Sequence, residues 1–173
     1  MIPLFSAVSS GLTWSKLPRN QGYELKRNNA VVGSLRRASF WSSNYLAETG
    51  DGQWAFRRGG FFGTGAEIVD SASQQRLATF KSDWGGGGTL IFSDGQTFRV
   101  RCKGWWRPVW SVIAEDGQPV LHLHTREKTV EVPTGPAIPE SRLCLLILFG
   151  WYRVLQAEQD AASAAVVAVI AAS

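Results

Sequence analysis

The sequence predicts a mainly β protein, a closed antiparallel β-barrel of about 11–12 strands around a central hydrophobic C-terminal helix. Three observations lead to this fold class. Short segments of alternating polarity follow one another between residues 22 and 133, an Asp-Gly-Gln tripeptide recurs between them, and a wholly apolar run follows near residue 143. A chain of 173 residues has the size of one domain, and we expect residues 1–173 to form a single one.

Tight turns separate the alternating segments. The tripeptide occurs as Asp51-Gly52-Gln53, Asp94-Gly95-Gln96 and Asp116-Gly117-Gln118, and Asn28-Asn29 is a weaker signal of the same kind. Asp-Gly suits the two positive-φ positions of a type I′ turn, whose twist matches that of the flanking strands. The sequence therefore predicts local hairpins that follow one another in chain order.

Eleven segments between these turns are candidate strands. They are 22–27, 30–37, 43–49, 53–58, 64–70, 75–83, 88–93, 96–103, 107–114, 119–126 and 128–133. So many short antiparallel strands favour a closed barrel, because closure removes the exposed edges of a flat sheet.

Segment 96–103 alternates most clearly, with apolar and basic residues on opposite faces. The apolar set is Phe98, Val100 and Cys102, and the basic set is Arg99, Arg101 and Lys103. We expect the apolar set to face the barrel interior and the basic set to face solvent.

A helix is predicted after the strands, over about 140–157. Pro139 precedes its start, and the run Leu143–Tyr152 is apolar on every side. A helix of this kind must be enclosed or lie in lipid, and this run is shorter than the roughly 20 residues that span a bilayer. A barrel of this width needs something in its bore, so we place the helix there. For the Ala/Val-rich tail at 160–173 we expect buried helix rather than a membrane anchor.

Basic side chains are concentrated in the first part of the chain. The net charge is +4, yet residues 1–110 hold 14 Lys and Arg against seven Asp and Glu, and window 96–110 holds no acid. Phosphate-bearing partners suit such a segment. The candidate anionic-ligand site is Arg99, Arg101, Lys103 and Arg107. The alternative interpretation is that these residues form the solvated outer face of a barrel strand.

Three tryptophans flank that segment, Trp105, Trp106 and Trp110. Exposed tryptophans can anchor a protein at a membrane interface or stack on bases. Because tryptophan is highly buried on average, we expect at least two of them in the core.

No enzymatic motif is recognised, and we expect neither catalysis nor a cofactor. Gly85–Gly88 lacks the Lys-Ser/Thr of a phosphate-binding loop and leads into a strand. His122 and His124 share a strand face, but a metal site would need a third ligand, for which Glu115, Asp116 or Glu131 are the candidates, so no metal is expected.

The two cysteines, Cys102 and Cys144, are expected to be buried free thiols, which suits a reducing compartment. No signal peptide is recognised at Met1–Lys16. We therefore expect a cytoplasmic location, with peripheral association at the inner membrane face if the partner is lipid.

The element order and several local sequences resemble the tubby C-terminal-like superfamily, which includes tubby proteins, phospholipid scramblases and LURP-one-related proteins. The local sequences, which are similar to small bacterial members, are Gly52-Gln-Trp-Ala-Phe-Arg-Arg-Gly59, Ala78-Thr-Phe80, Gly88-Thr-Leu90, Asp94-Gly95 and Leu148-Phe-Gly-Trp-Tyr152. The resemblance covers about residues 22–156. It implies a barrel around a hydrophobic helix and a link to membrane lipids. Tubby proteins bind phosphoinositide headgroups through basic residues, but those positions have no match here.

The function hypothesis is a non-enzymatic binding module for anionic lipid headgroups or a membrane surface. One alternative is a barrel that binds nucleic acid through the Arg- and Trp-rich segment 96–110. Another is a structural or protein-interaction barrel.

Overall fold

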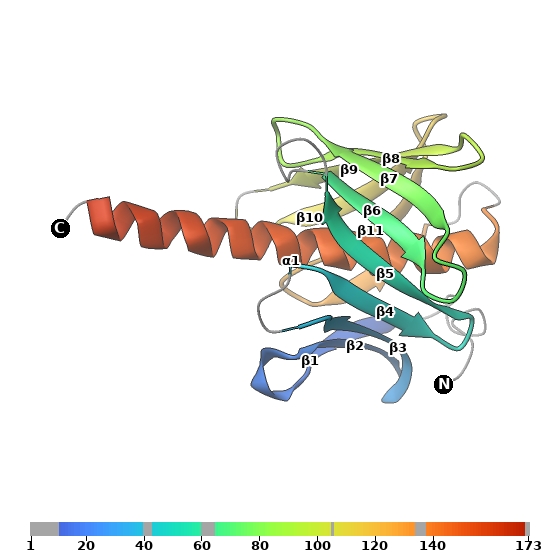
Figure 1. Cartoon of the computed structure of the whole chain (residues 1–173), viewed down its shortest axis with the longest axis horizontal. Coiled ribbons are helices and arrows are strands. Elements are labelled where there is room, and N and C mark those ends of the chain that lie inside the picture. Colours follow the sequence, from blue (N-terminus) through green and yellow to red (C-terminus); the bar gives the residue numbers. More distant parts are fainter. Residues whose placement is uncertain (1–10, 40–42, 60–64, 105, 134–137, 172–173) are drawn as a thin grey trace.

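The computed structural model describes residues 11–39, 43–59, 65–104, 106–133 and 138–171, and it shows a strand barrel around one long helix (Figure 1). The strands are β1 Leu12–Lys16, β2 Gly22–Arg27, β3 Ala30–Arg37, β4 Tyr45–Thr49, β5 Gly52–Gly59, β6 Gly65–Asp70, β7 Arg76–Ser82, β8 Gly88–Phe92, β9 Thr97–Lys103, β10 Val109–Ala114, β11 Pro119–His124 and β12 Thr129–Glu131. A short 3-10 helix, η2, spans Pro18–Asn20, and the long helix α1 spans Glu140–Ala171.

The sheet is a closed antiparallel barrel in which each strand pairs with its successor in the chain and β1 pairs with β12. The predicted fold class is confirmed. The eleven predicted strands correspond to β2–β12, with ends that agree within two residues. The sequence prediction missed β1, which closes the barrel through Leu12 opposite Val130. β1 also pairs with β2 across the connection 17–21, but this connection has no Asp-Gly or Asn-Asn turn signal, so the search for turns did not indicate the strand.

The predicted type I′ turns were misassigned. Gly95 and Gly117 have positive φ, at 89° and 84°, but the preceding aspartates do not. Instead the Oδ1 atoms of Asp94 and Asp116 accept the backbone N–H two residues ahead, which is an Asx turn. Asn28-Asn29, the weaker signal, has positive φ at both residues, at 48° and 67°, as a type I′ turn requires.

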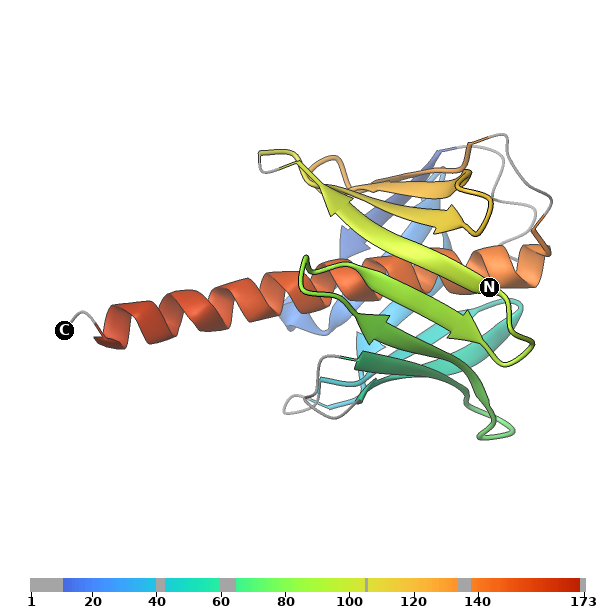
Figure 2. The same ribbon diagram turned by 90° about the horizontal axis from the view of Figure 1, so that it is seen from above.

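The first half of α1 runs through the bore of the barrel (Figure 2). Every residue from 144 to 156 is buried, and Leu146, Leu148 and Phe149 are fully inaccessible to solvent. The predicted enclosure is therefore confirmed for residues 144–156, while Ser141 is exposed and Leu143 is half-buried.

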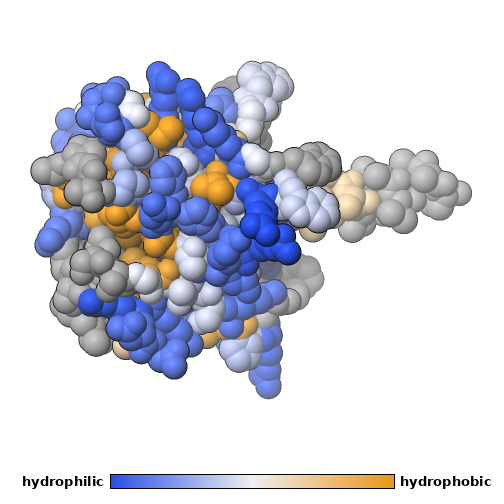
Figure 3. Space-filling model, turned by 180° about the vertical axis from the view of Figure 1, so that it is seen from behind, coloured by the Kyte–Doolittle hydropathy of each residue, from blue (hydrophilic) through white to orange (hydrophobic). Residues whose placement is uncertain are grey.

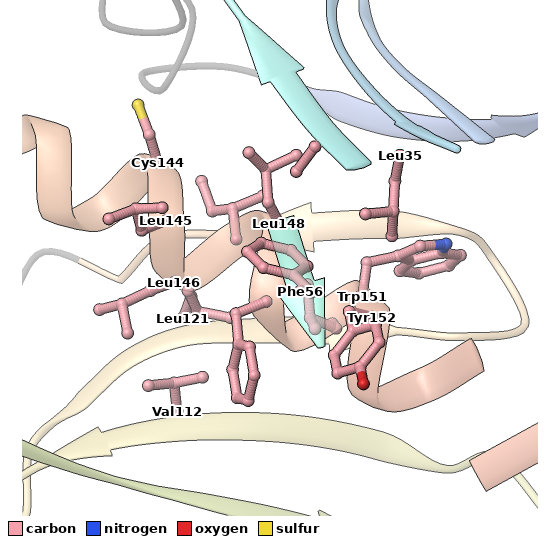
Figure 4. Close-up of a cluster of buried hydrophobic side chains, with 14 of the residues drawn as sticks. Leu35, Phe56, Val112, Leu121, Cys144, Leu145, Leu146, Leu148, Trp151 and Tyr152 are labelled. Carbon is pink, nitrogen blue, oxygen red and sulfur yellow. The ribbon is translucent and has the colours of Figure 1, made fainter. Parts of the chain in front are cut away.

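Aromatic contacts join the helix to the barrel wall around its circumference. The rings of Trp14 on β1 and Trp151 stack at 5.0 Å, and Phe149 contacts Phe56 on β5 and Phe80 on β7 at 5.8 and 5.3 Å. Figure 4 shows strand side chains that converge with those of the helix in this core.

Gly150 lets α1 approach β11 closely. A Cβ atom on Gly150 would lie only 2.6 Å from a methyl carbon of Leu123. The helix is thus held against the wall at one point where no larger residue fits without movement of Leu123.

The second half of α1 leaves the barrel and projects from it (Figures 1 and 2). The helix continues without interruption to Ala171, and residues 161–165 are exposed. The prediction that the tail would be buried is wrong for these residues. The enclosed length of the helix is set by the height of the barrel, whereas the predicted burial rested on composition alone.

The alternation of β9 is mostly confirmed. Phe98 and Val100 are buried while the side chains of the basic set are exposed. Cys102 is only half-buried, since it lies near the end of the strand, so its predicted full burial is wrong. Cys144 is buried as predicted.

The buried helix should contribute most of the stability of the barrel. Replacement of Phe149, which is fully buried, by Ala should lower the free energy of unfolding by about 3–5 kcal/mol, because it leaves a cavity between α1, β5 and β7. Urea titration followed by far-UV circular dichroism measures this change. Ala164→Ser, at an exposed position of the same helix, is the matched control and should cost less than about 0.7 kcal/mol. Equal effects of the two changes would contradict the enclosed helix.

Alkaline pH should unfold the protein through two buried groups on α1. Burial, with a smaller contribution from Asp51, raises the pKa of Cys144 from 9.0 to about 12, and burial raises that of Tyr152 from 10.0 to about 12. In the unfolded chain both groups ionise at lower pH than in the folded one. Stability is therefore complete below about pH 9 and is lost as pH rises towards 12. Cys144→Ala should reduce the loss between pH 9 and 10 in urea titrations, and an unchanged pH dependence in this variant would contradict the assignment.

Candidate functional site

The barrel has two different ends, because alternate connections of an antiparallel meander lie at the same end. The entry end is where α1 begins, and the exit end is where it emerges. We define the exit rim as the described residues from the last residue of β1, β3, β5, β7, β9 and β11 to the first residue of the next strand. The entry rim is the corresponding set between β2 and β3, β4 and β5, β6 and β7, β8 and β9, and β10 and β11, together with Glu131–Arg142.

Charge is strongly divided between the two rims. The exit rim has seven basic residues and two acidic ones: Lys16, Arg19, Arg37, Lys103, Arg107, Arg126 and Lys128, with Asp83 and Glu127. The entry rim has three basic residues and seven acidic ones: Arg27, Arg76 and Arg142, with Asp51, Asp70, Asp94, Glu115, Asp116, Glu131 and Glu140. α1 adds Glu158 and Asp160 at the exit end, where Glu158 interacts with Lys16 and Lys128. With these two acids included, the end from which the helix emerges is still positive and the other end is negative. Figure 3 shows strongly hydrophilic side chains around the base of the projecting helix.

Exposed large hydrophobic side chains gather at the same end. Among the described residues they are Leu46, Trp84 and Trp106. Trp84 and Trp106 belong to the exit rim and are 107% and 79% exposed, and Leu46 is the second residue of β4, next to this rim. Exposed tryptophan is unusual in a soluble domain, and two on one charged rim indicate an interaction surface.

The prediction that at least two of the three flanking tryptophans lie in the core stays a prediction, because the structure describes only two of them. Trp110 is buried in the core, Trp106 is exposed, and Trp105 lies outside the described residues. Sequence reasoning missed Trp84, which immediately precedes the glycine run Gly85–Gly88. Trp84 lies between β7 and β8 and Trp106 between β9 and β10, and alternate connections of a meander lie at the same end. This strand order is the signal that could have placed both tryptophans on one rim.

The structure separates the four predicted anion-binding residues into two pairs. Arg99 and Arg101 lie on the outer wall of β9, opposite Ile113 and Ser111 of β10, while Lys103 and Arg107 belong to the exit rim. Arg99 also lines a shallow depression of about 300 Å³ together with Glu115. Although the sequence window 96–110 contains no acid, the folded chain brings Glu115 close to Arg99. The densest positive charge lies at the exit rim instead.

The projecting helix is fixed to the exit end by polar contacts. Arg58, one residue before the end of β5, donates hydrogen bonds to Asp160 in an ion pair of 3.1 Å, and Gln156 Nε2 donates to the carbonyl oxygen of Ser43 at 3.2 Å. Beyond Asp160 the sequence has no charged residue. In the part of the chain that the structure describes, no helix has both the length and the apolar character needed to span a membrane.

The two histidines lie on the outer wall and have separate partners. His122 Nδ1 lies 2.8 Å from Ser111 Oγ, and His124 Nε2 lies 3.2 Å from Glu131 Oε2. The described residues contain no group of three His, Cys, Asp or Glu side chains that could hold a metal ion.

Comparison with known proteins identifies no relative: no family model, no curated protein and no solved structure matches this chain.

Proposed function

We propose that this protein is a non-enzymatic, tubby-like barrel that binds anionic lipid headgroups at a membrane surface through its exit rim. The observation that carries the proposal is the coincidence, at one end of the barrel, of a basic rim, two exposed tryptophans and an emerging apolar helix.

The energetics of membrane association favour this combination. A basic residue close to an anionic membrane contributes about 1 kcal/mol, and tryptophan partitions to the level of the headgroups. Durable peripheral binding usually takes two signals, one electrostatic and one hydrophobic. The exit rim supplies the first, and Trp84, Trp106 and the helix beyond Asp160 supply the second.

Lipid suits this surface better than nucleic acid does. Basic side chains and exposed tryptophans could also bind phosphates and stack on bases. However, nucleic acid offers nothing to an uncharged helix that emerges from the middle of the binding face, whereas a bilayer can accommodate it. A structural or protein-interaction role would need no such division of charge between the two rims.

We also propose that the chain is a member of the tubby C-terminal-like superfamily. The closed barrel of twelve strands, with a buried hydrophobic helix that follows them in the chain, supports it. The lipid-binding role is argued from the exit rim of this chain alone.

Charge reversal on the rim tests the proposal. In Lys103→Glu/Arg107→Glu two attractions are replaced by two repulsions, so affinity for vesicles that contain phosphatidylglycerol should fall at least tenfold, which is about 1.4 kcal/mol. Vesicle cosedimentation at an ionic strength of about 0.1 M measures the affinity. Arg99→Glu/Arg101→Glu, on the wall, should have a smaller effect because these positions lie farther from the rim.

Arg76→Glu is the control, because Arg76 is exposed, lies on the entry rim and forms an exposed ion pair with Glu67. It should change vesicle affinity less than about twofold, as expected for a charge beyond a Debye length of about 10 Å from the membrane. If the wild-type protein fails to bind anionic vesicles, or if Arg76→Glu weakens binding as much as the rim reversal, the proposal fails. Binding to nucleic acid but not to vesicles, with steep loss in salt, would establish the nucleic-acid alternative instead.

A further inference from the structure

One arginine inside the barrel forms no ion pair with the residues that the structure describes. Arg153, on α1, is only 9% exposed, and its Nε–H has no hydrogen-bond partner among the described residues. Its Nη2 donates one long bond, 3.5 Å, to the carbonyl oxygen of Gly86, and its guanidinium lies 4.5 Å from the centre of the Phe80 ring. Burial lowers the pKa of this group, but arginine remains charged at neutral pH.

The nearby carboxylates are engaged elsewhere. Asp160 pairs with Arg58 at 3.1 Å, and Asp83 Oδ1 accepts the backbone N–H of Gly85 at 3.0 Å. Neither forms an ion pair with Arg153 in the described structure. Asp160 and Asp83 act on Arg153 electrostatically without contacting its guanidinium. A buried guanidinium with an unsatisfied N–H is costly, and a bound anion can supply the missing contact.

Arg142 on the same helix shows what a structural arginine looks like in this barrel. Its guanidinium also lies over a phenylalanine ring, 4.2 Å from the centre of Phe92. In contrast to Arg153, it forms an ion pair of 2.8 Å with Asp94 and donates a hydrogen bond to Gln96. The two arginines share their aromatic support and differ in the anion, which Arg153 lacks.

A second unsatisfied donor lies next to Arg153 in the chain. The hydroxyl group of Tyr152 is buried and has no hydrogen-bond partner among the described residues. Arg58, which acts electrostatically on both Tyr152 and Arg153, lies above them near the exit rim with its side chain 34% exposed. Two unsatisfied donors and a second guanidinium thus lie at one end of the bore.

We propose that the exit end of the bore contains a binding site for a single phosphate group, free or carried by a lipid headgroup, with Arg153 as its main ligand and the Tyr152 hydroxyl as a second donor. Phosphate fits because arginine presents several N–H donors in a planar fork that matches phosphate oxygens. The proposal goes beyond the membrane-binding function and rests on it only if the phosphate belongs to a lipid.

The connection between β7 and β8 provides a path to Arg153. The guanidinium donates to the carbonyl oxygen of Gly86, which is exposed, so at this point the connection lies between Arg153 and solvent. The connection contains Gly85, Gly86 and Gly87, and a Cβ atom at Gly86 would meet nothing within 4 Å. Gly87 is packed closely, since a Cβ atom there would lie 2.5 Å from the carbonyl oxygen of Val100, so the freedom to shift and admit a small anion lies at Gly85 and Gly86.

Phosphate-dependent thermal stability tests the site. Inorganic phosphate should raise the Tm of the wild-type protein above its value in chloride of equal ionic strength, because the ligand binds only the folded state. In Arg153→Met this difference should shrink to the small rise that phosphate gives any protein by exclusion from its surface. The unliganded variant should be about as stable as the wild type, since a buried charge that forms no ion pair is removed.

Arg142→Met is the matched control. It breaks a satisfied ion pair, so it should lower the Tm but keep the full response to phosphate. If Arg153→Met does not fold, Arg153→Lys, which retains the charge without the fork, should bind phosphate about tenfold more weakly than wild type. An Arg153 variant that keeps the wild-type response to phosphate overturns the proposal, and so does a wild-type response no larger than that of Arg153→Met.

Vesicles distinguish the source of the phosphate. If it belongs to a lipid, Arg153→Met should bind phosphatidic acid vesicles more weakly than wild type does and phosphatidylglycerol vesicles equally well, because only the first presents a terminal phosphate. If the phosphate is free, both kinds of vesicle should bind the variant and the wild type alike. Failure of vesicle binding by the wild-type protein would refute the proposed function but not this site, which the soluble phosphate assay tests independently.

Discussion

The bore of the barrel must be filled, and the rest of the structure depends on how this is done. Twelve strands enclose a space wider than their own side chains can fill, and an empty apolar cavity of that size would forfeit the packing that stabilises the fold. The run from Cys144 to Gln156 fills it, with Phe149, Trp151 and Tyr152 packed against rings on β1, β2, β4, β5 and β7. Because the helix runs through the bore in one direction, the two ends of the barrel differ: the helix begins at the entry end and projects from the exit end.

The sequence was sufficient for the elements that local chemistry determines. The hairpin turns located eleven of the strands, and the run Leu143–Tyr152, apolar on every side, indicated a buried helix. Turn types were harder to predict, because the side chains of Asp94 and Asp116 compete for backbone N–H groups and leave only the following glycine at positive φ. The closing strand β1 was missed because its hairpin with β2 has no Asp-Gly or Asn-Asn turn signal, and its second partner, β12, lies at the other end of the strand order.

The candidate site was only partly predictable. The basic alternation of β9 was clear, but a search for charge within one stretch of sequence favoured Arg99 and Arg101 and overlooked residues that only the closed barrel brings together. Lys16, Lys128 and Trp84 come from three separate connections that share the exit end. In an antiparallel meander, the connections from odd-numbered to even-numbered strands all lie at one end. The order of the strands therefore already predicts that these three residues share an end. Arg153 is different again: its lack of a carboxylate partner is visible only once the surroundings of the helix are known.

The central claim is that the helix axis directs the exit end towards an anionic membrane. Hydrogen–deuterium exchange, compared residue by residue between the free protein and the protein bound to phosphatidylglycerol vesicles, tests it most directly. Vesicles should slow exchange at the exit-end connections 17–21, 83–87 and 125–128 and leave the entry-end turns at 71–75 and 115–118 unchanged, while residues 144–156 exchange slowly in both states. Protection at the entry-end turns, or equal protection at both ends, would contradict the account.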